Sequence, residues 1–428
     1  MSTVPRGLPF AEALAAVLEP VAPLRETERV PLPMALGRAL AESLVSRVAL
    51  PPWDNAGMDG YAVQRTDVLG ASTDAPRVLT VLGTSLAGSD ASTLPTVARG
   101  TAVRIMTGAP VPSGADAVIR VEDTDGGTDR VIITHDRDAA GRGNVRPRGE
   151  DVGAGAPLFA PGTTLRAAHL GVLASCGVAE VAVTRRPRVT VLSSGDELVL
   201  LDRFAEVEAG RRIIASSSYA LPPLLEGAGA EVTVAPIVPD EPGALVAAMR
   251  AAIDGGCDVL ITTGGVSVGA HDFTRDAITT LGGEQRFWRA RIRPGGPIGT
   301  GVVGGVPWLG LPGNPVSTHV TALLFAWPLL RQLGGHAGVH HLRVPVTMAE
   351  SADTPAPLTY FLRVALTAGP DGALEARLAG PQGSNLIRTM ANTDALLAVP
   401  ETVDRVEPGF VGQAILLPDT PLLTRSPA

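Results

Sequence analysis

Strand-like and helix-like segments alternate through the middle of the chain. Apolar runs typical of buried strands lie at Val189–Leu192, Val232–Val238, Val259–Thr262 and Trp308–Leu311. Segments with a helical spacing of apolar residues lie between or after them, at Ser217–Glu226, Gly243–Ile253, Phe273–Thr280 and Pro315–Leu330. This alternation predicts a doubly wound, mostly parallel α/β domain over residues 181–335, with helices on both faces of its sheet.

The flanking segments follow other patterns. Helical periodicity at Phe10–Leu18, Met34–Leu44 and Leu165–Cys176 predicts a helical or linker domain built from residues 1–50 and 136–180. Short β-type runs separated by turn residues predict a small β-rich domain over 51–135, with strands at Arg77–Leu82, Ala102–Met106, Ala117–Val121 and Val131–Thr134. Further strands predict a C-terminal β-barrel over 336–428. The expected fold is therefore multidomain α/β plus β.

Charge and hydrophobicity argue against several classes of protein. The net charge is −8 and no dense basic run occurs, so we expect no nucleic-acid partner. The most apolar helix candidate, Val316–Leu330, contains Ser317, Thr318 and His319, which favours a buried helix over a membrane span. Residues 1–9 lack the pattern of a secretory signal, and the chain has only 2 cysteines. We therefore expect a cytoplasmic protein without a disulfide framework.

The basic residues are all of one type. The chain has 35 lysines and arginines in total, and every one of them is arginine. The absence of lysine excludes chemistry that uses a Schiff-base lysine or the lysine of a P-loop. Any basic site in this protein must therefore use guanidinium groups.

A polar loop follows each predicted strand of the α/β domain. These loops are Ser193–Glu197, Pro239–Pro242, Thr263–Gly269 and Leu311–Pro315. Ligands bind at the carboxyl edge of open α/β sheets, so we expect the loops to line one site. The loop Thr263–Gly269 could direct backbone N–H groups at an anion, although such turns also occur for geometric reasons alone; its candidate binding residues are Gly264, Gly265, Ser267 and Gly269.

Three acidic residues lie at or just after strand ends in this domain: Glu197, Asp240 and Asp272. Together they could converge on a divalent cation such as Mg²⁺ that bridges ligand phosphates. The positions of Asp196, Asp240 and Asp272 suit helix N-caps equally well. The pattern by itself leaves both interpretations open.

Arginines Arg289, Arg291 and Arg293 precede a segment rich in glycine and proline. Strand alternation would place Arg289 and Arg293 on one face, where two guanidinium groups could clamp an oxyanion. A solvated edge strand is the alternative. The histidines His336, His340 and His341 include an i, i+4 pair, but neighbouring glycines argue against a zinc-binding helix, and we assign them no metal.

Short motifs along the chain carry a resemblance to a known family. They are Pro52–Asn55, Met58–Val63, Arg104–Pro110, Asn144–Arg146, Gly149–Asp151, Ser194–Leu198, Gly264–Gly269, Arg293–Gly295 and Leu311–Ser317. In this order they resemble the molybdopterin molybdenumtransferases, the family of MoeA and the gephyrin E-domain. The resemblance implies an elongated, four-domain homodimer. It also implies insertion of molybdenum from molybdate into adenylylated molybdopterin, with release of AMP in the presence of Mg²⁺. The adenylyltransferase of the same pathway is then a candidate partner.

The resemblance also implies roles for individual residues. Carried over by position, Glu197, Asp240 and Asp272 would form the catalytic and metal-binding acidic cluster. The residues that would hold phosphate or molybdate, or shape the loops beside it, are Arg289, Arg293, Pro312, Pro315, Arg363 and Ser384. The residues that would reach across the dimer are Asp59, Thr107 and Asp151.

The chain departs from the family pattern in two places that bear on activity. Ala215-Ser216-Ser217 stands where Asp-Ser-Asn or Asp-Thr-Asn is common, and Pro357-Leu358-Thr359 stands where Gly-Arg-Arg is common. Two alternatives therefore remain: a molybdopterin adenylyltransferase, which shares the α/β domain, and a non-catalytic cofactor-binding paralogue or scaffold. The long flanking domains, with Arg363 and Ser384, favour molybdenum insertion.

Overall fold

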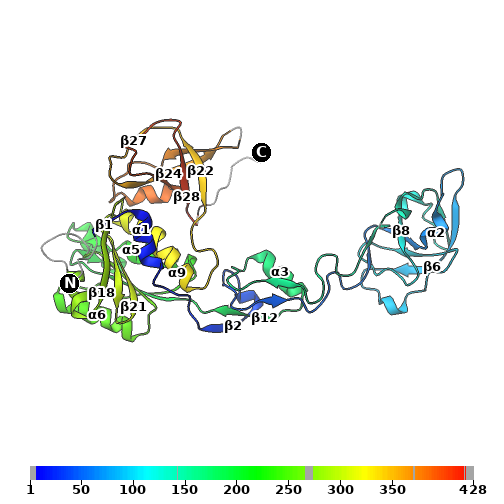
Figure 1. Ribbon diagram of the computed structural model, residues 1–428, viewed down its shortest axis with the longest axis horizontal. Helices are drawn as coiled ribbons and strands as arrows, with labels where there is room; N and C mark the ends of the chain where they lie inside the picture. Colours follow the sequence, from blue (N-terminus) through cyan, green and yellow to red (C-terminus); the bar gives the residue numbers. More distant parts are fainter. Residues whose placement is uncertain (1–5, 142, 266–272, 370–371, 419, 421–428) are drawn as a thin grey trace.

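The computed structural model describes residues 6–141, 143–265, 273–369, 372–418 and 420. In this structure the chain is elongated (Figure 1): a central α/β part and a C-terminal barrel lie at one end, and a small β domain lies at the other. A narrow arm, formed by residues 25–50 and 148–186, joins the two ends.

The central sheet has seven strands and is mixed. Its order is β1 (Arg6–Leu8), β18 (Glu284–Ala290), β20 (Gly299–Val303), β21 (Val306–Leu311), β17 (Val259–Thr263), β13 (Arg188–Ser193) and β16 (Glu231–Val234). The run from β21 to β16 is parallel, as predicted. Strand β20 is antiparallel to both neighbours. It enters a tight hairpin with β21 in which Gly304 and Gly305 have φ of 58° and 83°, the conformation that two-residue hairpin turns require.

Helices cover both faces of this sheet. The core on one face includes side chains from α1 (Phe10–Leu18), α5 (Ser217–Gly227), α8 (Pro315–Thr321) and α9 (Trp327–Leu333). The other core includes side chains from α6 (Pro242–Asp254) and α7 (Phe273–Thr280). A π-helical segment, Ala322–Ala326, continues α8 into α9. Helix α1 thus packs on the central sheet, although its sequence position suggested a separate N-terminal helical segment.

The helix expected over Met34–Leu44 does not form. A single 3-10 turn at Leu32–Met34 is followed by extended chain that pairs with the return segment of the arm. Gly37 has φ of 76°, and its N–H donates to the carbonyl of Leu165, so long-range pairing replaces the helical bonds. The regular elements of the arm are β2 (Thr27–Pro31) with β12 (Glu180–Thr184), β3 (Leu44–Val45) with β11 (Pro157–Phe159), and α3 (Ala167–Ser175).

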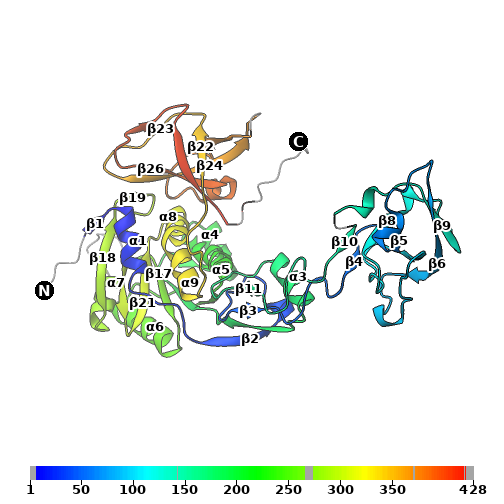
Figure 2. The same cartoon turned by 45° about the vertical axis from the view of Figure 1, so that its right-hand side comes forward.

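The small β domain contains a five-stranded sheet (Figure 2). Its order is β8 (Ala117–Arg120), β5 (Gly60–Val63), β7 (Thr101–Ile105), β6 (Arg77–Ser85) and β9 (Arg130–Ile133). Two short strands, β4 (Asn55–Ala56) and β10 (Val145–Arg146), pair where the chain enters and leaves the domain. The strands predicted for this region are all present, and β5 is an additional one.

The C-terminal β-barrel predicted from the sequence is confirmed. Strands β24 (Thr359–Ala368), β25 (Leu374–Leu378), β22 (Arg343–Met348), β28 (Val411–Leu416) and β26 (Ala395–Val399) pair in this order, and β26 pairs back to β24. The buried side chains of Val346, Leu362 and Leu397 fill its interior. Strand β19 (Ile292–Arg293) pairs with β24 and so ties the central part to the barrel. None of the helices that the structure describes is long and apolar enough to cross a membrane.

Candidate active site

A pocket of about 660 Å³ lies at the carboxyl edge of the parallel strands. The loops after β13, β16, β17 and β21 and the start of α5 form its walls. The residues predicted from the sequence that line it are Glu197, Asp240, Gly264, Gly265, Pro312 and Pro315. Hydroxyl groups line it as well, since Ser193, Ser216 and Thr263 are among its wall residues. We refer to this pocket as the edge pocket.

Glu197 and Asp240, the two acidic residues of the edge pocket, lie on neighbouring loops, and Asp196 directly precedes Glu197. The N–H of Asp240 donates to Asp196 Oδ1 at 3.2 Å, and the N–H of Asp196 donates to Asp240 Oδ2 at 3.4 Å. These reciprocal bonds fix one loop against the other. Helix α6 has Glu241 as its N-cap residue, so the N-cap interpretation is wrong for Asp240. Asp272 lies outside the described residues, among which no cluster of three or more metal-ligating side chains occurs.

The geometry of the turn after β17 requires glycine at two positions. Gly264 and Gly265 have φ of 87° and 67°. A Cβ atom at Gly265 would lie 2.4 Å from Thr274 Oγ1, so this position excludes side chains sterically as well as by conformation. Thr263 Oγ1 donates to Ser193 Oγ at 2.9 Å and joins the turn to β13. The remaining predicted residues of the loop, Ser267 and Gly269, lie outside the described residues.

A second pocket, of about 460 Å³, lies between the central part and the barrel. Arg289, Arg293 and Pro312 line it from the central part, and Leu358 and Ser384 line it from the barrel side. We call it the arginine pocket. It adjoins the edge pocket, because Pro297, Pro312 and Asn314 line both.

The arginines of this pocket are held in distinct ways. Arg289 has φ of 75°, a conformation that non-glycine residues adopt rarely. The Arg293 guanidinium carbon lies 5.8 Å from the centre of the Tyr360 ring. Arg291 Nε donates to Glu401 Oε2 at 3.0 Å. The solvated-edge interpretation is wrong for β18, because that strand lies between β1 and β20.

Arg363 and Ser384 belong to one local structure. Asn314 Nδ2 donates to Ser384 Oγ at 3.1 Å, which brings Ser384 to the pocket wall. Arg363 is fully buried and donates to Thr389 Oγ1 at 2.9 Å and to the carbonyls of Pro381 and Gly383 at 2.9 and 3.2 Å. Burial lowers the pKa of Arg363 to about 10. Arg363 thus lies behind the loop that carries Ser384 and lines neither pocket.

Of the residues expected to reach across a dimer, Asp59 and Thr107 flank strands β5 and β7 of the small β domain, at the opposite end of the molecule (Figures 1 and 2), and Asp151 lies on the arm. Thr107 donates to Asp59 Oδ1 through its N–H at 2.6 Å and its hydroxyl at 2.7 Å, and both bonds hold the pKa of this exposed carboxyl below its usual value. Asp151 is also exposed, and its N–H donates to the carbonyl of Leu50 at 2.9 Å. Within one chain these residues do not meet the two pockets.

The small β domain has a pocket that the site prediction did not include. Its volume is about 400 Å³, and Arg137, Asp138, Asn144, Arg146 and Glu150 are among its wall residues. The sequence signal for it was the Asn144–Arg146 motif, which carried part of the resemblance but supplied no predicted site residue.

Comparisons with known proteins agree with this architecture. Three family models match the chain: the MoeA N-terminal region (domain I and II) at residues 8–177, a probable molybdopterin binding domain at 190–332, and the MoeA C-terminal region (domain IV) at 345–417. A protein named molybdopterin molybdenumtransferase 2 from Mycobacterium tuberculosis is 37% identical over 387 residues, which cover 89% of this chain and 92% of the relative. A molybdopterin molybdenumtransferase from Nostoc sp. is 37% identical over 383 residues, covering 88% and 85%.

Solved structures are similar over nearly the whole length. A crystal structure of the molybdopterin biosynthesis moeA protein from Pyrococcus horikoshii OT3 matches with a TM-score of 0.82 and 26% identity, covering 96% of this chain and 100% of that one. A second structure of a moea protein, described as from Pyrococcus horikosii, matches with a TM-score of 0.77 and 30% identity, covering 96% and 99%. On the strength of the three matched regions, the relatives and the shared fold, the chain belongs to the MoeA family of molybdopterin molybdenumtransferases, which act in molybdenum cofactor biosynthesis.

Proposed function

We propose that this protein inserts molybdenum from molybdate into adenylylated molybdopterin and releases AMP. The observation that carries the proposal is the contact between two unlike pockets. The edge pocket has carboxylates and a glycine turn, the arginine pocket has guanidinium groups, and Pro312 and Asn314 form a wall of both. A nucleotide-linked pterin and a tetrahedral oxyanion could therefore bind side by side.

The edge pocket suits the pterin nucleotide. Gly264 and Gly265 bring backbone close to the ligand, and the hydroxyl groups of Ser193, Ser216 and Thr263 offer hydrogen bonds. This chain lacks a carboxylate at Ala215, so we assign pterin recognition at this wall to the hydroxyls of Ser216 and Ser217.

The acidic residues fit a magnesium ion. Mg²⁺ binds proteins through one or two carboxylates and takes its other ligands from water and substrate phosphates, and Glu197 and Asp240 supply that number in the edge pocket. We assign Asp272 to the same cluster. A bound Mg²⁺ would neutralise charge on the phosphoanhydride. The carboxylates themselves would orient the adenylyl group for departure as AMP.

The arginine pocket suits molybdate. The guanidinium groups of Arg289 and Arg293 can donate paired hydrogen bonds to a tetrahedral oxyanion. Ser384 adds a hydroxyl from the barrel side. Since Arg363 bonds the carbonyl before Ser384, its part in molybdate binding would be to hold that loop.

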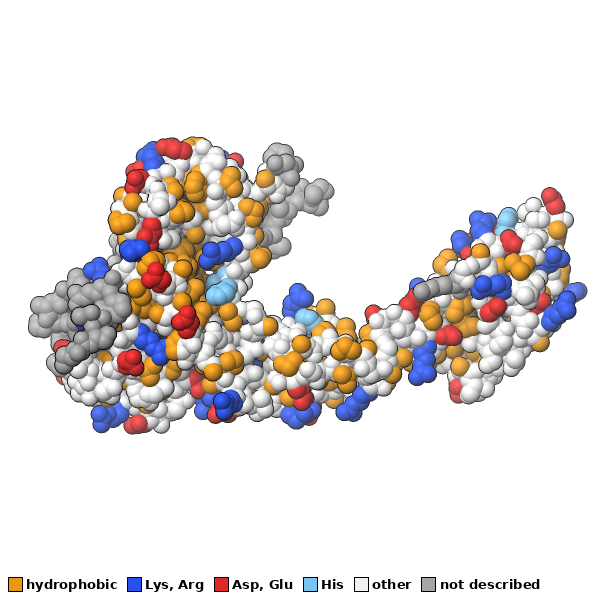
Figure 3. Space-filling view, viewed as in Figure 1, with side chains coloured by type: hydrophobic (Ala, Val, Ile, Leu, Met, Phe, Trp, Pro, Cys, Tyr) orange, Lys and Arg blue, Asp and Glu red, His pale blue; other side chains and the backbone are white. Residues whose placement is uncertain are grey.

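A second copy of the chain would complete the site. Asp59 and Thr107 flank strands β5 and β7 of the small β domain, which Figure 2 shows at the far end of the arm, and none of Asp59, Thr107 and Asp151 lines either pocket of its own chain. The arm also exposes large apolar side chains, visible along it in Figure 3, with Met34 68%, Leu36 57% and Val45 54% exposed. We propose a homodimer that buries this surface and acts in the cytoplasm, with the pathway's adenylyltransferase as the partner that delivers its substrate.

The test is AMP release from adenylylated molybdopterin with Mg²⁺, with and without molybdate. We expect molybdate-dependent release by the wild type and a loss of about 100-fold in the Glu197→Gln and Asp272→Asn variants, because each removes a charge from the acidic cluster. Unchanged release by both variants would contradict the assignment. Pyrophosphate formed from ATP and molybdopterin would instead identify an adenylyltransferase, and tight binding without release would identify a scaffold.

A further inference from the structure

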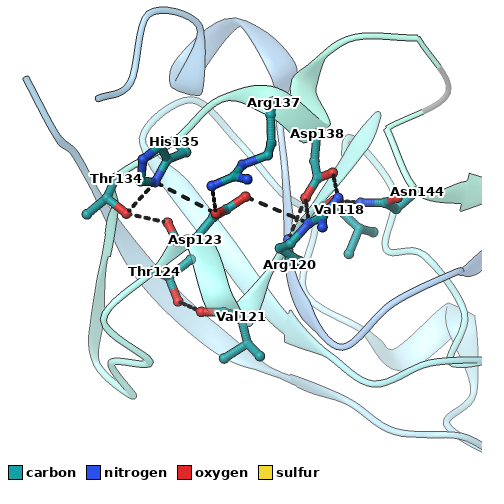
Figure 4. Close-up of polar contacts among 10 residues, drawn as sticks. All are labelled: Val118, Arg120, Val121, Asp123, Thr124, Thr134, His135, Arg137, Asp138 and Asn144. Carbon is teal, nitrogen blue, oxygen red and sulfur yellow. Dashed lines mark hydrogen bonds and ion pairs between the residues drawn. The ribbon is translucent and has the colours of Figure 1, made fainter. Parts of the chain in front are cut away.

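A network of ion pairs around two buried carboxylates lies in the small β domain (Figure 4). None of its residues lines the edge pocket or the arginine pocket. Asp138 is 7% exposed. It accepts from Arg120 Nε and Nη2, both at 2.7 Å, and from the Arg120 N–H at 3.2 Å. These bonds, with one from the Asn144 side chain, hold the pKa of Asp138 below its usual value. The paired geometry fixes both partners in one orientation.

A second carboxylate braces the same arginine. Asp123 is 2% exposed, accepts from Arg137 Nη2 at 2.8 Å and lies 3.7 Å from Arg120 Nε. Arg120 therefore lies between the buried carboxylates of Asp123 and Asp138, and Arg137 forms a second ion pair with Asp123. Breaking one of these ion pairs would leave a buried carboxylate without its partner, so the network favours a single arrangement of these side chains.

The network continues to Asn144, which has an unusual backbone conformation. Its φ is 54°, and its side-chain amide donates to the carbonyl of Val118 at 3.0 Å in addition to its bond with Asp138. The carbonyl of Asn144 accepts from the N–H of Gly57 at 2.7 Å. Side-chain bonds thus hold Asn144 in the left-handed region, and the resulting turn holds Gly57.

One branch of the network reaches the backbone of Asp59, and the other reaches Gly57. Gly57 lies two residues before Asp59. On the other side, Val121 directly follows Arg120 in sequence, and its N–H donates to the carbonyl of Asp59 at 3.0 Å. The carboxylate of Asp59 is itself fixed by Thr107. Neither Asp138 nor Asn144 forms a hydrogen bond with Asp59, so any effect on it is transmitted through the backbone.

We propose that Asp138 and Asn144 form a positioning latch that holds Asp59 for the reaction in the partner's pocket. This inference rests on the proposed function, because it takes Asp59 as a residue that reaches the substrate. A displacement of about 1 Å at a reacting group can cost up to about 100-fold in rate, so a latch of this kind has a measurable kinetic effect. Its loss should lower kcat and leave KM for adenylylated molybdopterin unchanged, because the walls of the edge pocket assigned to that ligand contain no residue of the small β domain.

The experiment compares Asn144→Gly and Asp138→Asn with Asp136→Asn. Glycine tolerates the left-handed backbone at position 144, so that substitution removes only the side-chain bonds. Asp136 is the matched control, because it lies two residues from Asp138 and its carboxylate accepts from Gly70 instead. We expect kcat to fall about tenfold in both latch variants, with KM unchanged, and to stay at the wild-type value in the control.

Two further measurements identify the route of the effect. Adding Asn144→Gly to an Asp59→Asn variant should cause no further loss of kcat, because the latch acts through Asp59. Deuterium uptake by the full-length latch variants should exceed that of the wild type in the segment 55–63 and equal it in the barrel. Wild-type kcat in both latch variants, or a loss that adds to that of Asp59→Asn, would overturn the proposal.

Failure of the proposed function would look different. If Asp59→Asn alone retains full activity, the assignment of Asp59 to the reaction is wrong. Deuterium uptake then decides whether the latch exists: faster exchange in 55–63 in the Asn144→Gly variant supports it, and unchanged exchange overturns it.

Discussion

At the scale of single residues, the walls of both pockets depend on backbone conformations that few residue types adopt. Gly264 and Gly265 form the turn after β17 with positive φ, and Arg289 adopts positive φ although it has a side chain. Such conformations persist only where neighbouring structure holds them, and they are often found at functional sites. Here they bring backbone and guanidinium groups to the carboxyl edge of the sheet.

The glycine turn predicts a sharp mutational effect. Gly265→Ala should lower the affinity for adenylylated molybdopterin by about 1–2 kcal/mol, because the new methyl group meets Thr274 Oγ1 and forces an unfavourable φ. Isothermal titration checks the affinity. Gly243→Ala is the control: no atom lies within 4 Å of a Cβ at this helical position, so affinity should not change. Equal affinity of all three proteins would show that the turn does not contact the ligand.

Arg363 predicts a selective effect on one substrate. Arg363→Ala should weaken molybdate about tenfold and leave adenylylated molybdopterin unaffected, because only the loop that carries Ser384 loses its support. Arg363→Lys keeps the charge but lacks the planar guanidinium group, so its affinity for molybdate should lie between those of the wild type and Arg363→Ala. Titration of AMP release against each substrate measures both constants. Equal loss for both substrates would mean that the residue stabilises the barrel as a whole.

At the scale of elements, the end of α9 is joined to the arm by a buried polar contact. The Thr164 hydroxyl bonds His336 Nδ1 at 2.8 Å and accepts from Arg331 Nη2 at 2.9 Å. The N–H of Ala337 donates to the carbonyl of Gly162 at 2.9 Å. Burial, followed by the charge of Arg331, lowers the pKa of His336 to about 3. The contact therefore requires a neutral imidazole.

This joint predicts that stability falls in mild acid. The unfolded chain takes up a proton on His336 below a pH of about 6.5, whereas the folded chain does so only near 3, so acid favours unfolding across that interval. From pH 7 to pH 5 the free energy of unfolding should fall by about 2 kcal/mol from this residue. Burial also lowers the pKa of His341, which acts in the same direction.

Urea titrations at the two pH values check this prediction. His336→Gln should remove most of the difference between pH 7 and pH 5, whereas His340→Gln, at an exposed position, should retain it. A pH dependence that is the same in the wild type and in His336→Gln would show that the joint does not depend on the neutral imidazole.

At the scale of the whole molecule, the arm separates the small β domain from the pockets (Figure 1). A site that uses both ends requires two chains, so defects at opposite ends should complement each other. A 1:1 mixture of Asp59→Asn and Asp240→Asn chains, dissociated and reassociated, should recover about a quarter of wild-type AMP release, since half of the dimers are mixed and each has one intact site. No recovery above the separate variants would argue for a site within one chain.

The sequence by itself determined the regular elements and their chemistry. Apolar spacing located the parallel strands, the helix Phe273–Thr280 and the strands of the barrel, because these segments carry their pattern within about ten residues. The motif loops fell at strand ends, and the sheet topology then brought Glu197, Asp240 and the Gly264–Gly265 turn to one pocket. Those features depend on local pattern and on the general rule that parallel strands share one carboxyl edge.

Only the tertiary structure decided what depends on contacts between distant segments. Strand β20 is rich in glycine and carries no strand pattern, yet its pairing with β18 and β21 makes the sheet mixed. Residues 34–44 have helical periodicity, but the return chain of the arm supplies their backbone bonds instead. The wall that Ser384 adds to the arginine pocket and the link from Asp138 to Asp59 likewise join positions far apart in sequence. Long-range packing and hydrogen bonding outweigh local preference at such places, because local propensities amount to only about 1 kcal/mol per residue.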